Sequence, residues 1–322
     1  MPIRRALVVC QDNLLKNCSD VNTDFISTGP SITPGSPDAA ESFASLVEKI
    51  LRAFNRLATG RYDLVILPAA KLSWPHDQSR VKKQIRRLIR AVLSLQIKIH
   101  LLGLFGKKPR IAFLDRYDST DIYPEIPTAL GADIYFKANF KPNPSANFPF
   151  KVQFLPYWVF EENYSSLLEK KTDIFYCASI NSDARRRALR ELAVLAGQGV
   201  SIDHPKERIS FPEFVARMGQ AVLTLSPSGY GYHGFRHYEA MLMQSVPVLN
   251  TNHLRVESDL VDRQTCLLYE DEVEGDLARR MTDALKNRAD LIEWGKKLRS
   301  FGSQNHSTSS VGSYLMARME ES

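Results

Sequence analysis

A glycine-containing loop followed by an arginine and a glutamate is the part of this sequence best suited to bind an anion. Residues 222–250 read VLTLSPSGYGYHGFRHYEAMLMQSVPVLN, which predicts a strand at 222–225, a loop, a helix at 235–244 and a strand at 246–249. Glycine allows a backbone to approach a phosphate closely, and a helix N-terminus attracts negative charge. Arg236 and Glu239 lie one turn apart on the predicted helix. This arrangement favours a diphosphate site in which Glu239 accepts hydrogen bonds from ribose hydroxyls. The alternative is a surface turn with a solvated Arg–Glu pair.

Carboxylates follow a predicted strand in the N-terminal half. The sequence FLDRYDSTD places Asp115, Asp118 and Asp121 at every third position after a strand predicted at 110–114. A carboxylate at the carboxyl end of such a strand can act as general base on an acceptor hydroxyl, or orient that hydroxyl, and we expect Asp118 or Asp115 to do so. A loop of turn and capping residues is the alternative. The sequence has no Asp-x-Asp motif, so no bound metal ion is expected.

Three consecutive arginines open a predicted helix in the C-terminal half. Arg185, Arg186 and Arg187 lie at the start of the helix at 183–196, directly after a strand predicted at 173–178. A helix that follows the first strand of a nucleotide-binding domain points its N-terminus at the ligand, so one of these arginines could meet a diphosphate. Neighbouring residues cannot all face inward, and we select Arg185. A solvated helix face is the alternative.

Short apolar strands alternate with amphipathic helices along most of the chain, which predicts an α/β fold with parallel sheets. Four prolines at 141–156 interrupt this pattern, and such a density prevents continuous helix or sheet pairing. We therefore expect two Rossmann-like, doubly wound domains, residues 1–150 and 151–322, that face each other across a cleft. The further strands are predicted at 5–10, 62–67, 133–136 and 265–269, and the further helices at 43–57, 79–95, 211–218, 275–286, 289–301 and 312–320.

The segment 226–248, SPSGYGYHGFRHYEAMLMQSVPV, resembles the donor-site signature of GT-B glycosyltransferases, in particular exostosin-like and related bacterial families. Their pattern is roughly SP-x-G-x-G, then R-x-x-E-A, then a small residue and VPV. Asp115 and Asp118, followed by DIYFK at 133–137, resemble the N-terminal D-x-x-D … D-x-Y-F-K segment of the same families. One departure is Gln244-Ser245, where these families usually have glycine, which predicts a helix exit of different shape.

The resemblance implies a glycosyltransferase that moves a sugar from a nucleotide-sugar donor to a hydroxyl of a glycan or lipid-linked saccharide acceptor, without a cofactor or metal. Residues 1–150 would bind the acceptor and residues 151–322 the donor. Arg236 and Glu239 would contact the diphosphate and the ribose. Backbone or hydroxyl donors would come from Ser228, Gly229, Tyr230 and Gly231. A non-catalytic nucleotide- or glycan-binding protein of the same fold is the alternative, whereas a serine hydrolase is excluded because no GxSxG motif is present.

The positive charge of the chain is concentrated in its N-terminal half. Residues 1–156 contain 22 Lys and Arg against 13 Asp and Glu, whereas the whole chain has a net charge of +6. The basic amphipathic segment 80–110 could lie against an anionic membrane, or could pack on a sheet with its cations in water. No nucleic-acid-binding motif accompanies this charge. No apolar run reaches the length of a membrane span and the N-terminal one is too short for a signal peptide, so we expect a cytoplasmic protein, with peripheral contact at the inner membrane face left open.

Overall fold

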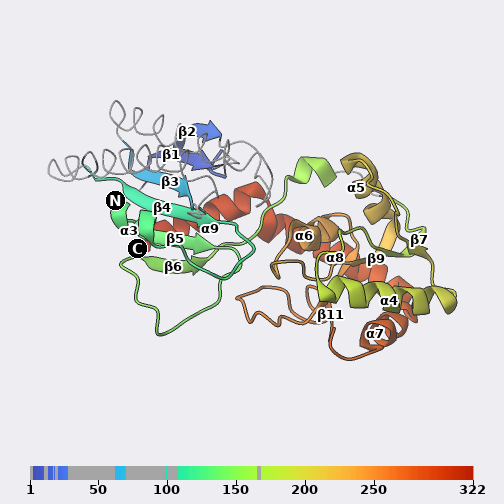
Figure 1. Ribbon diagram of the computed structural model, residues 1–322. Coiled ribbons are helices and arrows are strands. Elements are labelled where there is room, and N and C mark those ends of the chain that lie inside the picture. The colour runs from blue at the N-terminus through green and yellow to red at the C-terminus, as the bar shows by residue number, and fades with distance from the viewer. Residues whose placement is uncertain are drawn as a thin grey trace.

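The computed structural model describes residues 3–10, 14–16, 18, 21–27, 62–69, 97, 99, 108–164 and 168–321. These residues form two parallel β-sheets in two units that lie next to each other (Figure 1). The helices predicted at 43–57 and 79–95, and most of the basic segment 80–110, lie outside the described residues. Within the described ranges, no helix is long and apolar enough to cross a bilayer.

The first sheet has the strand order β2-β1-β3-β4-β5-β6, and each neighbouring pair is parallel. Residues of β3 and β4 are buried almost throughout, as expected for central strands covered on both faces. A short helix, α3 (Glu125–Leu130), precedes β5 and ends at Gly131, whose φ of 65° is the left-handed conformation that glycine favours. The strands are β1 (Arg5–Cys10), β2 (Asn22–Ser27), β3 (Leu64–Pro68), β4 (Arg110–Asp115), β5 (Ile134–Lys137) and β6 (Lys151–Phe154).

Two strands of this sheet differ from the sequence expectation. The polar sequence NTDFIS of β2 is not predicted as a strand, yet it pairs with β1 at the sheet edge. β6 lies inside the proline-rich segment 141–156, and the prediction that this segment has no sheet pairing is wrong, because β6 pairs with β5 over four residues. The prolines at 149 and 156 flank the strand KVQF and do not interrupt it, so its N–H groups remain available to the ladder.

The second sheet has the order β11-β10-β9-β7-β8 and is also parallel. Every residue of β9 and β10 is buried, so the apolar runs AVLTL and VPVLN form the centre of this unit. The strands are β7 (Thr172–Phe175), β8 (Ile202–Asp203), β9 (Ala221–Leu225), β10 (Val246–Asn250) and β11 (Leu267–Tyr269). The helices are α4 (Asp183–Gly197), α5 (Phe211–Gln220), α6 (Phe235–Leu242), α7 (Asp276–Leu285) and α8 (Arg288–His306).

The last helix, α9 (Thr308–Glu320), returns to the first sheet, as the red helix beside β5 in Figure 1 shows. Its Tyr314 ring lies 6.3 Å from that of Phe136, and the Tyr314 hydroxyl donates to the carbonyl of Phe154 at 2.9 Å. Arg110 of β4 donates to the carbonyl of Met319. We therefore propose that the first unit includes β6 and α9, and that the boundary between the units lies after β6.

The two units touch where the carboxyl end of β5 meets the loop between β9 and α6. Asn139 follows β5, and its side-chain oxygen accepts from the backbone N–H groups of Tyr232 and His233, both at 3.0 Å. The N–H of Glu257 donates to the carbonyl of Phe140 at 2.6 Å. Carboxyl ends of parallel strands are where ligands bind in such sheets, so these contacts surround the place where a site is expected.

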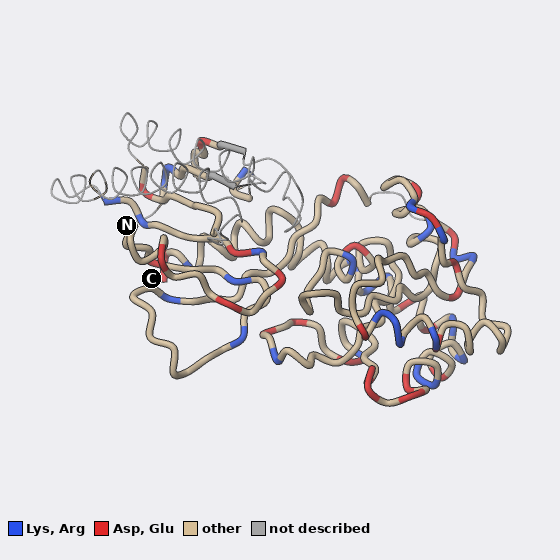
Figure 2. The backbone as a smooth tube through the Cα atoms, in the orientation of Figure 1, with Lys and Arg blue, Asp and Glu red and all other residues tan. Residues whose placement is uncertain are grey.

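Charged residues of both signs are interleaved on the α4–α7 side of the second unit (Figure 2). Many of them pair directly: Arg187 lies 2.5 Å from Asp271, and Arg280 lies 3.3 Å from Asp262. An arginine in this unit that has no carboxylate partner is therefore a candidate for binding an anion.

Candidate functional site

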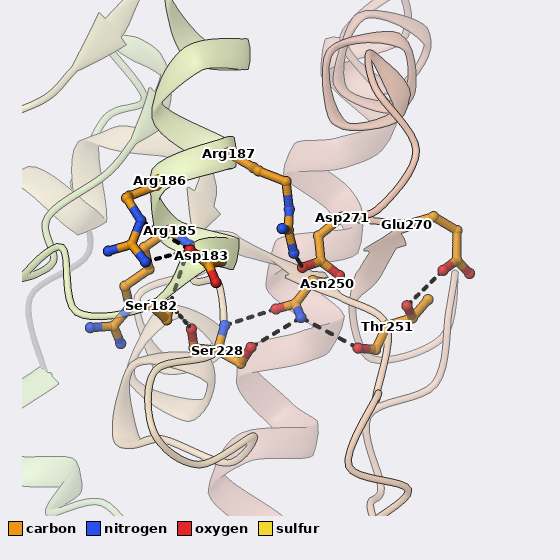
Figure 3. Close-up of polar contacts among 10 residues, drawn as sticks. All are labelled: Ser182, Asp183, Arg185, Arg186, Arg187, Ser228, Asn250, Thr251, Glu270 and Asp271. Carbon is orange, nitrogen blue, oxygen red and sulfur yellow. Dashed lines mark hydrogen bonds and ion pairs between the residues drawn. The ribbon is translucent and has the colours of Figure 1, made fainter.

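The loop that joins β9 to α6 is tied to the neighbouring strand by one asparagine. The side-chain oxygen of Asn250, the last residue of β10, accepts from the N–H of Ser228 at 2.8 Å, and its amide nitrogen donates to the Ser228 hydroxyl at 3.0 Å (Figure 3). The Ser182 hydroxyl, which caps α4, donates to the carbonyl of Ser228 at 2.7 Å. Ser228 thus uses its polar groups to hold the loop, so a direct role as a ligand donor remains only a prediction.

The glycines of this loop are explained by close approach, not by unusual backbone conformation. Positive φ among the described glycines occurs at 131, 199 and 275, not in the loop. A Cβ added at Gly229 would lie 2.9 Å from Nη2 of Arg185. A Cβ added at Gly231 would lie 3.0 Å from the carbonyl oxygen of Asp118 in the other unit. Gly229 therefore leaves room for the guanidinium of Arg185, and Gly231 leaves room for the backbone of Asp118 in the first unit.

Arg236 is a cation that forms no direct ion pair with a described carboxylate, although the charge of Glu239 acts on it. It lies in the first turn of α6, a helix whose N-cap, Gly234, provides no side-chain hydrogen bond. Its Nε is buried and has no hydrogen-bond partner, and its guanidinium lies 5.7 Å from the ring centre of Phe214. Burial lowers the pKa of Arg236, and Glu239 opposes this shift. A buried cation at a helix N-terminus is unfavourable by itself, so this position is suited to a bound anion.

The three arginines of α4 point in different directions, as Figure 3 shows. Arg186 pairs with exposed Asp183, and Arg187 pairs with Asp271, which follows β11. Arg185 donates through Nε to the carbonyl of Pro227 at 3.3 Å and lies against Gly229. Burial lowers the pKa of Arg185, and the nearby charge of Arg236 lowers it further. Arg185 is therefore the member of the triplet that shares the loop with Arg236.

Glu239 lies one turn after Arg236 on α6 and is held by a tyrosine. Its Oε1 accepts from the hydroxyl of Tyr164 at 2.7 Å. Burial raises the pKa of Glu239, whereas the hydrogen bond from Tyr164 and the charge of Arg236 lower it. A carboxylate fixed beside a cation matches the arrangement expected for ribose and diphosphate recognition.

Asp118 faces this group of cations from the first unit. Its backbone lies against Gly231, and Arg185 and Lys137 are the cations that act on its carboxylate. Burial raises the pKa of Asp118, and these two cations oppose the shift. The structure thus brings Asp118, Arg185 and Gly231 together, although they are far apart in the sequence.

Asp115 has a different place from the one expected for a catalytic carboxylate. Its side chain is fully buried and lies 3.0 Å from Nζ of Lys137, which is also fully buried. The hydroxyl of Tyr135 and the N–H of Tyr117 both donate to it. All these partners leave no exposed oxygen for an acceptor, so a catalytic role for Asp115 does not fit the geometry. Asp115 instead links the ends of β4 and β5. Two of its partners, Tyr135 and Lys137, belong to the DIYFK segment.

Several residues that shape the site belong to none of the motifs read from the sequence. Asn139 and Asn250 fix the two sides of the loop, and Tyr164 holds Glu239. For Asn250 the sequence does contain a signal, because it is a polar residue at the end of the apolar run VPVL. Tyr230, by contrast, is 72% exposed, so its predicted role in donor binding remains a prediction. The described residues contain no group of three His, Cys, Asp or Glu placed to hold a metal ion.

The exit of α6 contains the residue that departs from the family pattern. Gln244 has a φ of 55°, the left-handed conformation in which glycine is favoured. Its carbonyl oxygen would lie 2.2 Å from a Cβ added at Gly295 of α8, so this tight exit also requires a glycine on the facing helix. The left-handed conformation of Gln244, two residues before Val246, therefore gives a physical reason for a glycine at this helix exit.

Comparison with known proteins identifies the fold. The sequence matches no protein-family model and no curated protein. Among solved structures, sucrose-phosphate synthase from Thermosynechococcus elongatus is 12% identical over 99% of both chains, with a TM-score of 0.54. A glycosyltransferase from Rickettsia africae is 9% identical over 99% of this chain and 98% of its own, with a TM-score of 0.58. A trehalose-6-phosphate structure from E. coli bound with UDP-2-fluoro glucose is 10% identical over 99% of both chains, with a TM-score of 0.59.

These similarities extend over nearly the whole chain and therefore cover both sheets. They confirm the fold predicted from alternating strands and helices, whereas the exostosin-like assignment stays a prediction. At this level of identity they establish architecture and not activity. The chain has the two-unit, doubly wound α/β architecture of the GT-B glycosyltransferases.

Proposed function

We propose that this protein is a glycosyltransferase that transfers a sugar from a nucleotide-sugar donor to a hydroxyl of a glycan or lipid-linked saccharide. The observation that carries the proposal is the pair of arginines, Arg185 and Arg236, beside the glycine loop at the N-termini of α4 and α6. Neither forms an ion pair with a described carboxylate, and burial lowers the pKa of both. Two neighbouring, partly buried cations of this kind are suited to a doubly charged diphosphate.

The departing nucleoside diphosphate gains negative charge as the bond between its terminal phosphate oxygen and the anomeric carbon of the sugar breaks and the acceptor oxygen bonds to that carbon. Arg185, Arg236 and backbone N–H groups at the start of α6 would stabilise this charge in place, which lowers the barrier electrostatically. Glu239 would bind the ribose hydroxyls one turn further along the helix. The neighbour bound with UDP-2-fluoro glucose supports a nucleotide sugar as the ligand class.

Asp118 is the carboxylate that we propose as the acceptor-side base. Its backbone lies opposite Gly231. Unlike the carboxylate of Asp115, its two carboxylate oxygens are not both occupied by partners among the described residues. Desolvation raises its pKa, which makes it a better proton acceptor, and the charges of Lys137 and Arg185 oppose this shift. It would take the proton of the acceptor hydroxyl as that oxygen attacks the sugar.

We also propose that transfer does not depend on a divalent metal, because Arg185 and Arg236 supply positive charge where a metal acts in other sites. Activity is then expected to be unchanged after EDTA treatment. A loss of activity on chelation that Mg²⁺ or Mn²⁺ restores would show that this part of the proposal is wrong.

A thermal-shift screen against UDP-, GDP-, CMP- and dTDP-sugars tests the donor site. We expect stabilisation by sugars of one base, because a ligand that binds only the folded state raises its melting temperature. Arg236→Ala should abolish the shift, whereas Arg186→Ala should preserve it, since Arg186 pairs with Asp183 outside the loop. If no nucleotide sugar shifts the wild type, or if both variants respond alike, the donor-site assignment fails.

The second candidate is a non-catalytic nucleotide- or glycan-binding protein of the same fold. Asp118→Asn separates the two functions, because it removes the base and leaves the arginines in place. For an enzyme, this variant should keep donor binding and lose turnover by about 100-fold or more. Donor binding by the wild type without any release of nucleoside diphosphate in the presence of acceptors would favour the binding protein.

The cellular location and the membrane contact remain proposals. We propose a cytoplasmic protein whose basic N-terminal half meets the anionic face of the inner membrane, since that half carries the net positive charge of the chain. Co-sedimentation with vesicles that contain anionic lipid, lost at high salt, would support this contact. Equal sedimentation with neutral vesicles would refute it.

A further inference from the structure

Tyr164 connects the segment between the two units with the candidate ribose ligand. It ends the short 3-10 helix η1 (Glu161–Tyr164), which lies between β6 of the first unit and β7 of the second. The side chain is buried, with its ring edge-to-face with that of Phe211 at 6.2 Å. Its hydroxyl donates to Oε1 of Glu239 at 2.7 Å.

The backbone of Tyr164 is fixed to the same helix that carries Glu239. Nη1 of Arg299, in α8, donates to the carbonyl of Tyr164 at 3.1 Å and to the carbonyl of Leu242 at 2.6 Å. Leu242 is the last residue of α6. Tyr164 is therefore anchored at the end of α6 through Arg299 and reaches the middle of α6 through its hydroxyl, so the phenol has little freedom to move.

We propose that Tyr164 is a positioning residue for the donor nucleotide, an inference that rests on the proposed function. With Oε1 held by the phenol, the plane of the Glu239 carboxylate is set, and Oε2 remains to accept from the ribose hydroxyls. A carboxylate already ordered before binding loses less rotational freedom when the ligand arrives. The hydroxyl of Tyr164 thus contributes to donor affinity without touching the donor.

The test compares nucleoside diphosphates that differ only in the hydroxyls which Glu239 would bind. Calorimetric titration uses UDP, GDP and CDP as probes, each beside its 2′,3′-dideoxy counterpart, on the full chain. Tyr164→Phe keeps the ring and removes the hydroxyl. It should weaken binding of the ribose form about five- to tenfold and leave the dideoxy form unchanged. Its effect should vanish in a Glu239→Ala background, because that change removes the acceptor of the Tyr164 hydroxyl.

A matched control is Tyr314→Phe. This tyrosine also donates its hydroxyl, to the carbonyl of Phe154, but it lies on α9 and packs against the first sheet. The control should bind both forms as the wild type does, and thermal melting shows whether each variant is folded.

The outcomes separate this inference from the function on which it rests. Equal weakening of the ribose and dideoxy forms by Tyr164→Phe would mean that the residue only supports the fold, and would overturn the inference alone. No change in either form would do the same. If the wild type binds none of the three nucleoside diphosphates, the donor-site assignment is wrong and the inference falls with it.

Discussion

Gly231 offers the sharpest test of how the two units form one site. It lies in the loop of the second unit, where a Cβ would be 2.8 Å from Nδ2 of Asn139, 3.0 Å from the carbonyl oxygen of Asp118 and 3.1 Å from its Cα. Two of these three atoms belong to the backbone, so they cannot rotate away. Gly231→Ala must therefore push the units apart or bend the loop.

The size of the effect follows from the cost of overpacking. An extra methyl in a filled space costs about 1–3 kcal/mol, which corresponds to about five- to 150-fold in an equilibrium. Because Arg236 and Glu239 lie wholly in the second unit, donor affinity should stay close to that of the wild type. Transfer requires Asp118 opposite the donor, so kcat/KM should fall by about tenfold or more.

The assay pairs calorimetry with the donor and measurement of nucleoside diphosphate release. Gly197→Ala is the matched control, because a Cβ at the end of α4 meets nothing within 4 Å. It should leave both quantities unchanged. Wild-type kcat/KM in Gly231→Ala would refute the reasoning that the contact between the units is required. A fall in donor affinity equal to the fall in kcat/KM would place the role of Gly231 in the loop alone.

Three further substitutions test the internal structure. Lys137→Met should lower the free energy of unfolding, measured by urea denaturation, by about 3–5 kcal/mol, because it leaves the buried carboxylate of Asp115 unpaired. A loss below about 1 kcal/mol would mean that the fold does not need this ion pair. Gln244→Gly should raise stability by about 1 kcal/mol, since the φ of 55° strains glutamine and not glycine, and a decrease would contradict that strain. Burial lowers the pKa of His237 to about 3, whereas in the unfolded state it has its usual value of 6.5. Between these values only the unfolded state binds the proton, so the free energy of unfolding should fall by about 1.4 kcal/mol for each unit by which the pH is lowered. His237→Asn should reduce that slope in acid-unfolding curves, and an unchanged slope would assign it to other groups.

Local signals predict four of the five strands of the second sheet and the loop within it, whereas the two-residue β8 is not predicted. The run VPVL is apolar and, with the polar Asn250 at its end, forms a fully buried parallel strand, because a strand covered on both faces needs no alternation. In α6, the three-residue separation of Arg236 and Glu239 places both on one face, since helical spacing is a property of the local backbone. By contrast, β2 and β6 were not recognised, since pairing with neighbours made these partly polar segments into strands.

The residue pattern alone predicts that the chain alternates strands and helices and that a cation and a carboxylate follow a glycine loop. Which of the similar residues face that loop depends on the folded chain. Asp115 and Asp118 look alike in FLDRYDSTD, but β5 lies beside β4 and places Lys137 against Asp115. Arg185 and Arg187 differ only by their direction around α4. The physical reason is that burial and charge pairing depend on neighbours brought from distant parts of the chain, which local spacing does not contain.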